Sequence, residues 1–381
     1  MIGALKSFVH QHFKALLLPV SLMAASILPG IAGSKNGPPP NIKSRFSNSS
    51  MHKKLTLAAA GFLFLASACH NNSGSSASQE SQSTTPAVNT ANVPVFNADT
   101  AYNYVAKQVA FGPRIPNTPA QEACANWIIN TVKPLADTVY VQRTTVTGPH
   151  REKLRCINVV AAFNPGAKDR VLVLAHWDTR PHADQDSGAN KDKPFDGADD
   201  GGSGVAVMLE AARHMKAQKI PANVGVDLLF TDVEDSGISE MPDSYALGTQ
   251  YWAHHPHVPG YKANYGILLD MVGGKNSIFA IETTSKDKAY SQMKMFWDVA
   301  NSLGGSQYFR YDESTSIDDD HVYVNNIIHI PTFDVLGWQT NGNFPAHWHT
   351  THDNMDIIDK TTLHIVGQTL LQVVYTQPFA Y

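Results

Sequence analysis

The sequence predicts an α/β sandwich in which helices flank a central, mixed and mostly parallel sheet. Segments of strand character alternate with segments of helix character from residue 94 to the end of the chain, as they do when helices connect parallel strands. Two strand-like segments, 171–175 (VLVLA) and 265–269 (YGILL), contain no charged residue, which is typical of strands buried on both faces. The 381 residues are also enough for a large core.

The expected elements follow from the spacing of apolar residues. Residues 204–216 (GVAVMLEAARHMK) have helical spacing, whereas 226–231 (VDLLFT) is a short apolar run of strand character. On these grounds the sequence predicts helices at 99–109 and 121–132, strands at 138–145, 154–163 and 171–175, a helix at 204–216, a strand at 226–231, a helix at 244–254, strands at 265–269 and 277–282, a helix at 286–303, a strand at 327–335 and a helix at 361–375.

The first part of the chain has the character of a targeting signal. Residues 51–69 (MHKKLTLAAAGFLFLASAC) combine a basic start, a short apolar run and small residues before Cys69. This layout resembles a bacterial lipoprotein signal, in which the Cys is lipidated; a plain cleaved signal or a buried helix is the alternative. Residues 1–50 contain another apolar stretch, so we expect an extra leader or an over-called start there, with Met51 as the true start.

A polar linker is expected to join this signal to one folded domain. Residues 70–93 are rich in Ser, Asn, Thr and Gln and cannot form a core, whereas residues 94–381 form a single catalytic α/β domain. We expect a monomeric periplasmic protein of the cell envelope, attached to the membrane only through a lipid anchor. Cys124 and Cys156 could pair in that oxidising compartment or remain buried thiols. A net charge of −4 excludes a basic surface for nucleic acid.

Polar side chains of the kind that bind metals follow three of the most apolar strands. In open α/β sheets, ligands bind beyond the carboxyl ends of the strands. Three such endings together therefore indicate a site. In chain order, the residues are His176 and Asp178, then Asp232, Glu234 and Asp235, and then Asp270.

Three further segments add carboxylates and imidazoles. Residues 197–204 (GADDGGSG) contain Asp199 and Asp200, one of which could instead cap the following helix. Residues 316–321 (SIDDDH) could be a solvated acidic loop, and the histidines of 344–354 (FPAHWHTTHDN) could be surface residues. Without a plausible thiolate, such an oxygen and nitrogen set suits Zn²⁺ with three protein ligands. A carboxylate left outside the metal sphere can then act as general base.

The order of these motifs resembles the α/β zinc aminopeptidases and, among them, the glutaminyl cyclases of animals and bacteria. The motifs are H-x-D, GADDGGSG, two acids after a buried strand, LLD and WHT, and the resemblance covers roughly residues 100–378. The DDH of 319–321 and the FPAHWHT of 344–350 favour the cyclases. The resemblance implies a three-layer sandwich with a twisted central sheet, the zinc aminopeptidase-like fold.

The resemblance also implies a role for each site residue. It places one zinc per chain on Asp200, Asp235 and His349, the general acid/base on Glu234, an assisting carboxylate pair on Asp270 and Asp319, and the substrate pocket on Trp348, Phe344 and Asp318. The chain departs from the animal cyclases in three ways. Asp235 replaces a Glu, Asp318 replaces a Gln, and residues 236–243 contain no Trp.

The implied activity is the conversion of N-terminal glutamine of peptides, with glutamate as a further substrate, to pyroglutamate. Glutamine would release ammonia in this reaction. One alternative is a di-zinc aminopeptidase in which His176 and Asp270 bind a second metal and Asp200 bridges the two. Another is a non-catalytic envelope binding protein of the same fold. Loss of Glu234 or of a metal ligand would favour that reading, and all of these residues are present.

Overall fold

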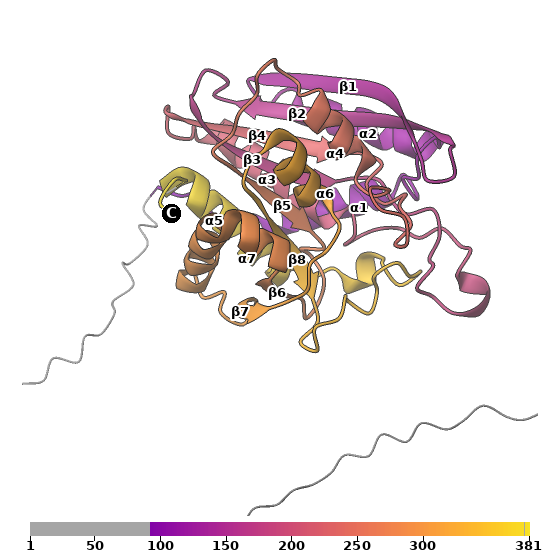
Figure 1. Ribbon diagram of the computed structural model, residues 1–381. Coiled ribbons are helices and arrows are strands. Elements are labelled where there is room, and N and C mark those ends of the chain that lie inside the picture. The colour runs from indigo at the N-terminus through magenta and orange to yellow at the C-terminus, as the bar shows by residue number, and fades with distance from the viewer. Residues whose placement is uncertain (1–91, 377) are drawn as a thin grey trace, which may run out of the picture. The chain divides into compact units, whose positions relative to one another are not determined.

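An eight-stranded sheet organises the chain in the computed structural model, which describes residues 92–376 and 378–381 (Figure 1). The expected leader, the signal segment with Cys69 and nearly all of the polar linker lie outside the described residues. No helix in the described part of the chain has both the length and the apolar character needed to cross a membrane.

The sheet is mixed, with a parallel centre. The strand order is β1-β2-β4-β3-β5-β8-β6-β7. The central strands β4, β3, β5 and β8 are parallel, and β2 and β6 join them in antiparallel fashion. At the edges, β1 pairs with β2 in antiparallel fashion and β7 pairs with β6 in parallel. This confirms the predicted fold class. The strands are β1 (Thr138–Thr147), β2 (Lys153–Phe163), β3 (Asp169–His176), β4 (Val224–Thr231), β5 (Tyr265–Asp270), β6 (Ile278–Ile281), β7 (Phe309–Glu313) and β8 (Thr332–Trp338).

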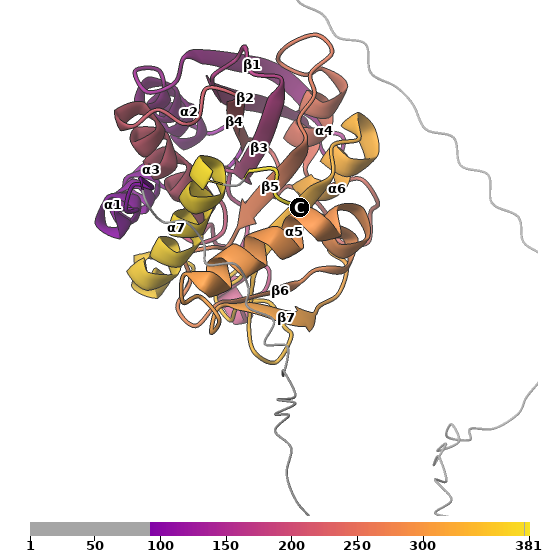
Figure 2. The same cartoon turned by 90° about the vertical axis from the view of Figure 1, so that its left-hand side faces the viewer.

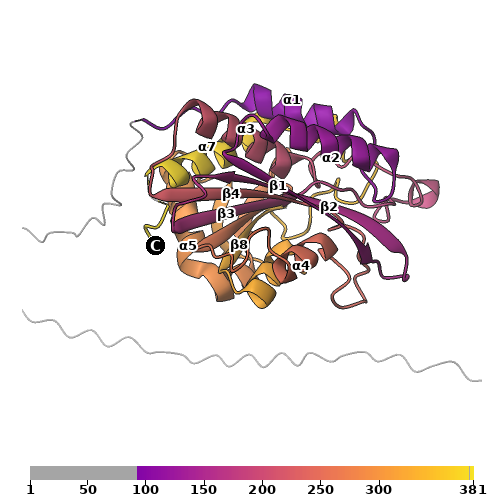
Figure 3. The same ribbon diagram turned by 90° about the horizontal axis from the view of Figure 1, so that it is seen from above.

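Helices cover both faces of the sheet. Seen from above, α1, α2, α3 and α7 lie on one side and α4 on the other (Figure 3), and α5 packs beside α7 (Figure 2). The helices are α1 (Ala98–Val109), α2 (Pro119–Val132), α3 (Ser203–Ala217), α4 (Leu247–His254), α5 (Thr283–Ser302), α6 (Asp320–Tyr323) and α7 (Lys360–Thr376).

The buried strands explain the uninterrupted apolar runs of the sequence. In β3, Val171 and Val173 pack into the core under α3 and α7, whereas Leu172 and Leu174 pack into the core under α4. Successive side chains of a strand point to opposite faces, so a strand covered on both sides needs apolar residues at every position. Both Cys124 and Cys156 are buried and free, which resolves the question of their pairing.

A glycine brings helix α3 close to the end of β5. A Cβ atom on Gly204 would lie 2.1 Å from the carbonyl oxygen of Leu269, so only glycine fits this contact. The approach places the loop before α3 next to Asp270, the last residue of β5. Two of the sequence motifs therefore meet at one edge of the sheet.

The predicted strand at 327–335 is wrong in its first half. Residues Val324–Ile328 instead form a short π-helix that continues α6, and strand β8 begins at Thr332. Pro331 has no N–H for a strand ladder, and the Asn325 side chain accepts a hydrogen bond from the Thr332 N–H and donates one to its carbonyl. The sequence analysis also missed β7 and α6, which are short and follow the polar segments 304–308 and 314–319.

Glu282 joins the start of α5 to the segment that follows β7. It is fully buried, and its carboxylate accepts hydrogen bonds from the backbone N–H groups of Thr284 and Ser285. The same carboxylate lies 3.1 Å from Nε2 of His321. Burial opposes ionisation, but these partners prevail and lower the pKa of Glu282 to about 2.

Glu282→Gln should destabilise the fold in a pH-dependent way. The pKa of Glu282 drops from 4.5 to about 2 on folding, so its charge stabilises the protein by about 3 kcal/mol at neutral pH. Because the folded pKa is depressed, this contribution is present above pH 4.5 and is lost as the pH falls toward 2. Denaturant unfolding at pH 7 and at pH 3.5 measures the free energy of unfolding of wild type and variant. The difference between the two proteins should be smaller at the lower pH. An equal difference at both values would contradict this account, and Glu313→Gln, on the surface, serves as control.

Candidate active site

The carboxyl ends of β3, β4 and β5 converge on one cavity. Its volume is about 240 Å³, which suits a single small side chain. Nine residues that the sequence analysis named as catalytic, metal-binding or substrate-binding line it: Asp200, Glu234, Asp235, Asp270, Asp318, Asp319, Phe344, Trp348 and His349. His176 is buried behind the wall and contacts Asp200 and Asp270.

Asp200, Asp235 and His349 form a buried cluster with the geometry of a metal site. One ligand atom of each lies within 4.8 Å of those of the other two. Nε2 of His349 is 3.2 Å from Oδ1 of Asp235 and 3.5 Å from Oδ2 of Asp200. The second oxygen of Asp235 and Oδ2 of Asp200 are buried without a hydrogen-bond partner. Buried, unsatisfied carboxylate oxygens are costly, and a cation between them would remove that cost.

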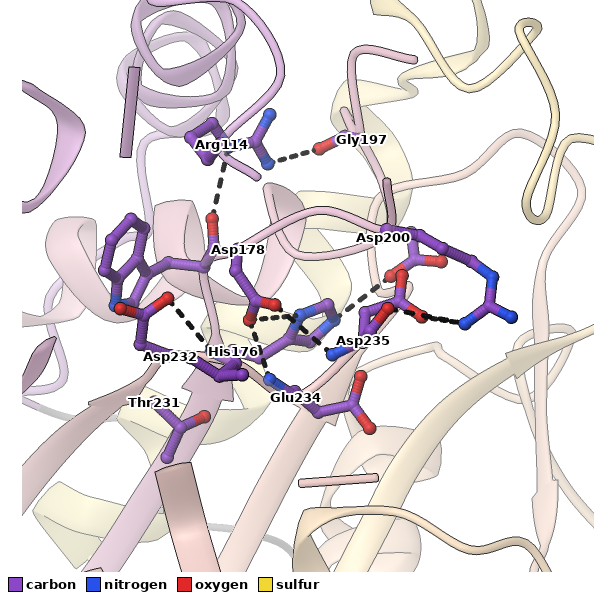
Figure 4. Close-up of polar contacts among 12 residues, drawn as sticks. Arg114, His176, Asp178, Gly197, Asp200, Thr231, Asp232, Glu234 and Asp235 are labelled. Carbon is purple, nitrogen blue, oxygen red and sulfur yellow. Dashed lines mark hydrogen bonds and ion pairs between the residues drawn. The ribbon is translucent and has the colours of Figure 1, made fainter. Parts of the chain in front are cut away.

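A second cluster shares Asp200 with the first. Nε2 of His176 lies 3.1 Å from Oδ1 of Asp200 (Figure 4). It also lies 3.3 Å from Oδ1 of Asp270. These three residues also satisfy the spacing of a metal site. The ligand sets of the one-zinc and the two-zinc hypotheses are therefore both present in space, with Asp200 where a bridging ligand would lie.

The loop that carries Asp200 is held by buried polar groups. The carboxylate of Asp353 accepts hydrogen bonds from the N–H groups of Asp199 and Asp200. The Arg114 guanidinium, also fully buried, donates to the carbonyls of Gly197 and Trp177 (Figure 4). Neither aspartate of this loop caps helix α3 with its side chain, because the N-cap residue is Gly202.

A strained turn after β4 separates the two acids Glu234 and Asp235 from the sheet. Val233 has φ 56°, in the left-handed region, which is rare for a β-branched residue and costs about 1–3 kcal/mol. The carboxylate of Asp178 accepts hydrogen bonds from the N–H groups of Glu234 and Asp235 (Figure 4). Asp178 therefore orients the turn and lies outside both metal clusters.

The carboxylates that surround the cavity hold their protons tightly. Burial, followed by the charges of Asp319 and Asp235, raises the pKa of Glu234 well above its ordinary value, although His176 opposes the rise. Burial and the charge of Asp270 likewise raise the pKa of Asp319. Burial raises the pKa of Asp270 to about 6 despite its contact with His176. The site thus contains carboxyl groups that can exchange a proton near neutral pH.

In the cluster of Asp200, Asp235 and His349, the pKa shifts of Asp235 and His349 favour the charged forms instead. Burial disfavours the charge of Asp235, but His349 and Arg180 outweigh that effect and lower its pKa. Burial also opposes protonation of His349, yet Asp235 and Asp184 raise the pKa of His349 to about 9. Asp235 is therefore ionised, as a metal ligand must be, while its neighbour in sequence, Glu234, retains a proton more readily.

Stacked aromatic rings form one wall of the cavity. Phe344 lies between Trp338 and Trp348, with ring centroids 5.0 and 4.2 Å away, and Trp348 stacks on His349 at 4.0 Å. His349 itself has φ 52°. The stack fixes the imidazole and covers it with apolar surface. On another side, Asp318 lines the cavity near Ile317, and burial raises the pKa of Asp318.

Several residues that the sequence singled out serve the fold instead. Asp232 accepts hydrogen bonds from Gln121 and from the Ile157 N–H. Nε2 of His347 lies 2.8 Å from Oδ2 of Asp199, whereas His352 is exposed. Of the three histidines in residues 344–354, only His349 belongs to a metal-type cluster.

The sequence analysis missed the groups that support the ligands. Arg180 contacts Asp184 and Asp235, and Asp184 in turn contacts His349. Tyr245 and Ser239 also line the cavity. Only the nearness of Arg180 to the H-x-D motif at 176–178 could have drawn attention to it in the sequence.

Comparisons with known proteins give one consistent group. The model of peptidase family M28 matches residues 158–374. A glutaminyl-peptide cyclotransferase of Bothrops jararaca is 26% identical over 291 residues, which cover 68% of this chain and 75% of that protein. The structure of a Zn-dependent exopeptidase from Parabacteroides distasonis is 46% identical, with a TM-score of 0.72, and covers 74% of this chain and 99% of that one. A glutaminyl cyclase of Bacteroides thetaiotaomicron, bound to N-acetylhistamine, is 42% identical with the same TM-score and the same two coverages.

Asp178→Ala should destabilise the turn that carries Glu234 and Asp235. Its loss leaves two buried N–H groups without an acceptor, at a cost of about 1–3 kcal/mol each. Denaturant unfolding of the metal-free protein should therefore give the highest free energy of unfolding for wild type, a lower one for Asp178→Asn and the lowest for Asp178→Ala. Asp137→Ala is the control, because Asp137 also accepts a backbone N–H, from Asn164, but at a partly exposed position. Equal losses at the two positions would contradict the role of Asp178.

Proposed function

The chain belongs to peptidase family M28, and we propose that it is a glutaminyl-peptide cyclotransferase of that family. One observation carries the proposal: a buried Glu234 carboxyl group stands beside the Asp200–Asp235–His349 cluster in a small cavity under an aromatic wall. The similarity to glutaminyl cyclases supports it. The substrates would be peptides or proteins that begin with glutamine.

The residues present fit a zinc ion. Two carboxylates and one imidazole match the ligand preference of Zn²⁺, and the unpartnered oxygens of Asp200 and Asp235 give it a reason to bind. Zinc held by this cluster would supply a Lewis acid that polarises the γ-carbonyl of the glutamine side chain. We propose one zinc per chain, held by these three residues.

Glu234 would move the proton of the reaction. It accepts a proton from the α-ammonium group of the substrate, which frees the amine to attack the carbonyl carbon (Cδ) of the side-chain amide of the same residue. A new C–N bond closes the five-membered ring, the amide C–N bond breaks, and Glu234 gives its proton to the departing nitrogen, which leaves as ammonia. The ring nitrogen loses its second proton, which leaves with the ammonia as ammonium. Burial makes Glu234 a stronger base than an exposed carboxylate.

The rest of the cavity would hold the bent conformer and exclude water. Attack within one residue gains most of its rate from orientation, and the wall of Phe344 and Trp348 leaves room for little beyond the glutamine side chain. Dryness matters because hydrolysis of the side chain to glutamate is the competing reaction. The charge of Asp270 raises the pKa of Asp319, and these two carboxyl groups would stabilise a shared proton near Glu234 during the transfer.

The signal-like segment suggests where the enzyme works. On the basis of residues 51–69 and the polar linker that follows, we propose a monomeric lipoprotein of the cell envelope, facing the periplasm. Its lipid anchor would be attached at Cys69. Globomycin treatment of producing cells, followed by mass measurement of the mature N-terminus, would test this placement.

The activity is tested by mass spectrometry of a glutamine-initiated peptide incubated with the purified protein and zinc. A product lighter by one ammonia, with every peptide bond intact, would support the cyclase. Release of free glutamine would overturn it in favour of the aminopeptidase. That rival has a specific observation in its favour, the cluster of His176, Asp200 and Asp270, and a similar structure described as an exopeptidase.

Glu234→Gln should lower turnover by about 10²–10⁴-fold, the contribution of a general acid/base, without loss of zinc. The amide keeps the shape of the side chain but cannot accept the proton. Initial rates and the zinc content of the same preparation are the measurements. Glu240→Gln, on the exposed part of the same loop, should leave both unchanged. Loss of zinc from the Glu234 variant would remove the role assigned to it.

Zinc analysis of dialysed protein should give one metal ion per chain. His349→Ala should abolish zinc binding because it removes a ligand of the three-residue cluster, whereas His176→Asn should retain it. Two zinc ions in the wild type, one of them lost in His176→Asn, would instead indicate the two-metal site of an aminopeptidase.

A further inference from the structure

Arg180 lies against the metal-type cluster, although the proposed reaction gives it no role. Its side chain is only 12% exposed. One nitrogen of the guanidinium, Nη1, donates to Oδ1 of Asp235 at 3.2 Å, to the carbonyl oxygen of Asp235 at 3.3 Å and to that of Gly237 at 3.1 Å. The guanidinium therefore fixes both the backbone and the carboxylate of Asp235.

The opposite side of the same guanidinium holds Asp184. Nε and Nη2 of Arg180 donate to Oδ2 of Asp184 at 3.0 and 2.7 Å. The other oxygen of Asp184 lies 3.3 Å from Nδ1 of His349. With Nδ1 turned toward Asp184, Nε2 of His349 faces Asp235 and Asp200. A carboxylate on one imidazole nitrogen fixes the ring and its tautomer for metal binding by the other.

These contacts close a ring that runs from Asp235 through Arg180 and Asp184 to His349 and back. Arg180 occupies Oδ1 of Asp235, so the remaining oxygen, Oδ2, is the one left buried without a partner. Oδ1 also lies 3.2 Å from Nε2 of His349, so Arg180 fixes how the carboxylate of Asp235 faces that nitrogen. It also lies over the ring of Tyr245, 5.9 Å from its centroid, and so links the cluster to the cavity wall.

The charge of Arg180 acts against metal binding. A cation beside a Zn²⁺ site repels the ion, so the charge taken alone would lower the affinity of the cluster for zinc. Any gain in zinc affinity must come from the geometry of the ligands. The planar, forked guanidinium is suited to holding them, and an ammonium group is not. Asp235 in particular has a short side chain, whose carboxylate position depends on its backbone, and Arg180 holds that backbone.

We propose that Arg180 is a positioning residue that holds two of the three zinc ligands, Asp235 directly and His349 through Asp184. The inference rests on the metal site of the proposed function but not on the reaction. Zinc affinity is measured without substrate. A protein that failed to cyclise glutamine, yet lost zinc affinity on substitution of Arg180, would overturn the proposed reaction and leave this inference standing.

The test is the zinc dissociation constant, obtained by competition with a chromophoric chelator, for wild type, Arg180→Lys and Arg180→Gln. Both variants should bind zinc about 10- to 100-fold more weakly, the usual effect of losing a group that orients metal ligands. The cobalt-substituted forms should show shifted visible absorption bands, because the ligand geometry changes. Arg213→Lys is the matched control, since Arg213 forks onto Glu210 in the same way but on helix α3.

The direction in which zinc affinity changes in Arg180→Gln distinguishes an effect on ligand geometry from an effect of the arginine charge. If Arg180 acted only through its charge, its removal would strengthen zinc binding and leave the cobalt spectrum unchanged, which would overturn the proposal.

Asp184→Asn provides a second route should the arginine variants unfold, as judged by circular dichroism of the metal-free protein. It should weaken zinc binding similarly, and the double variant with Arg180→Lys should lose less than the sum of the two single losses. Unchanged zinc affinity in Asp184→Asn, or additive losses, would contradict the ring of contacts.

Discussion

The crowding of carboxylates at the carboxyl edge of the parallel strands is the constraint on which the rest of the site depends. Asp200, Glu234, Asp235, Asp270 and Asp319 all line one cavity of about 240 Å³. Like charges at such range, removed from water, repel each other strongly. The protein relieves the repulsion in two ways. Glu234, Asp270 and Asp319 have raised pKa values, whereas Asp235 stays ionised beside His349 and Arg180.

This division of charge follows from the supports behind each acid. Further carboxylates, those of Asp178 and Asp353, are satisfied by backbone N–H groups and serve to aim the turns that carry the ligands. The turns themselves are strained, because Val233, Met271 and His349 all have positive φ values. Strain of this kind persists only where surrounding contacts dictate the conformation. In this site the three strained residues each lie next to, or are, a metal-type or catalytic residue.

The groups that hold the ligands in place differ between the cluster a cyclase would use and the second cluster a peptidase would need. Asp200 belongs to both metal-type clusters, with His349 on one side and His176 on the other. His349 is covered by Trp348 and held by Asp184, and Asp235 is held by Arg180. His176 instead contacts three carboxylates, Asp178 through Nδ1 and Asp200 and Asp270 through Nε2. The two clusters therefore share Asp200 but differ in the groups that surround their histidines.

The sequence by itself determined the fold class and the composition of the site. Apolar strands such as β3 and β5 are visible because burial on both faces demands apolar residues at every position, and the acids that follow them are visible because strand ends carry ligands. The sequence did not reveal β7 or α6, which are short, or the true start of β8, which depends on Pro331 and on the hydrogen bonds between Asn325 and Thr332. Nor did the sequence distinguish the metal ligands from the residues that hold those ligands in place. Asp178 and Asp235 are the same residue type at similar strand ends, and only the tertiary structure surrounds one with N–H donors and the other with His349 and Arg180. The role of a buried carboxylate is set by the groups that neutralise it, and those groups come from distant parts of the chain.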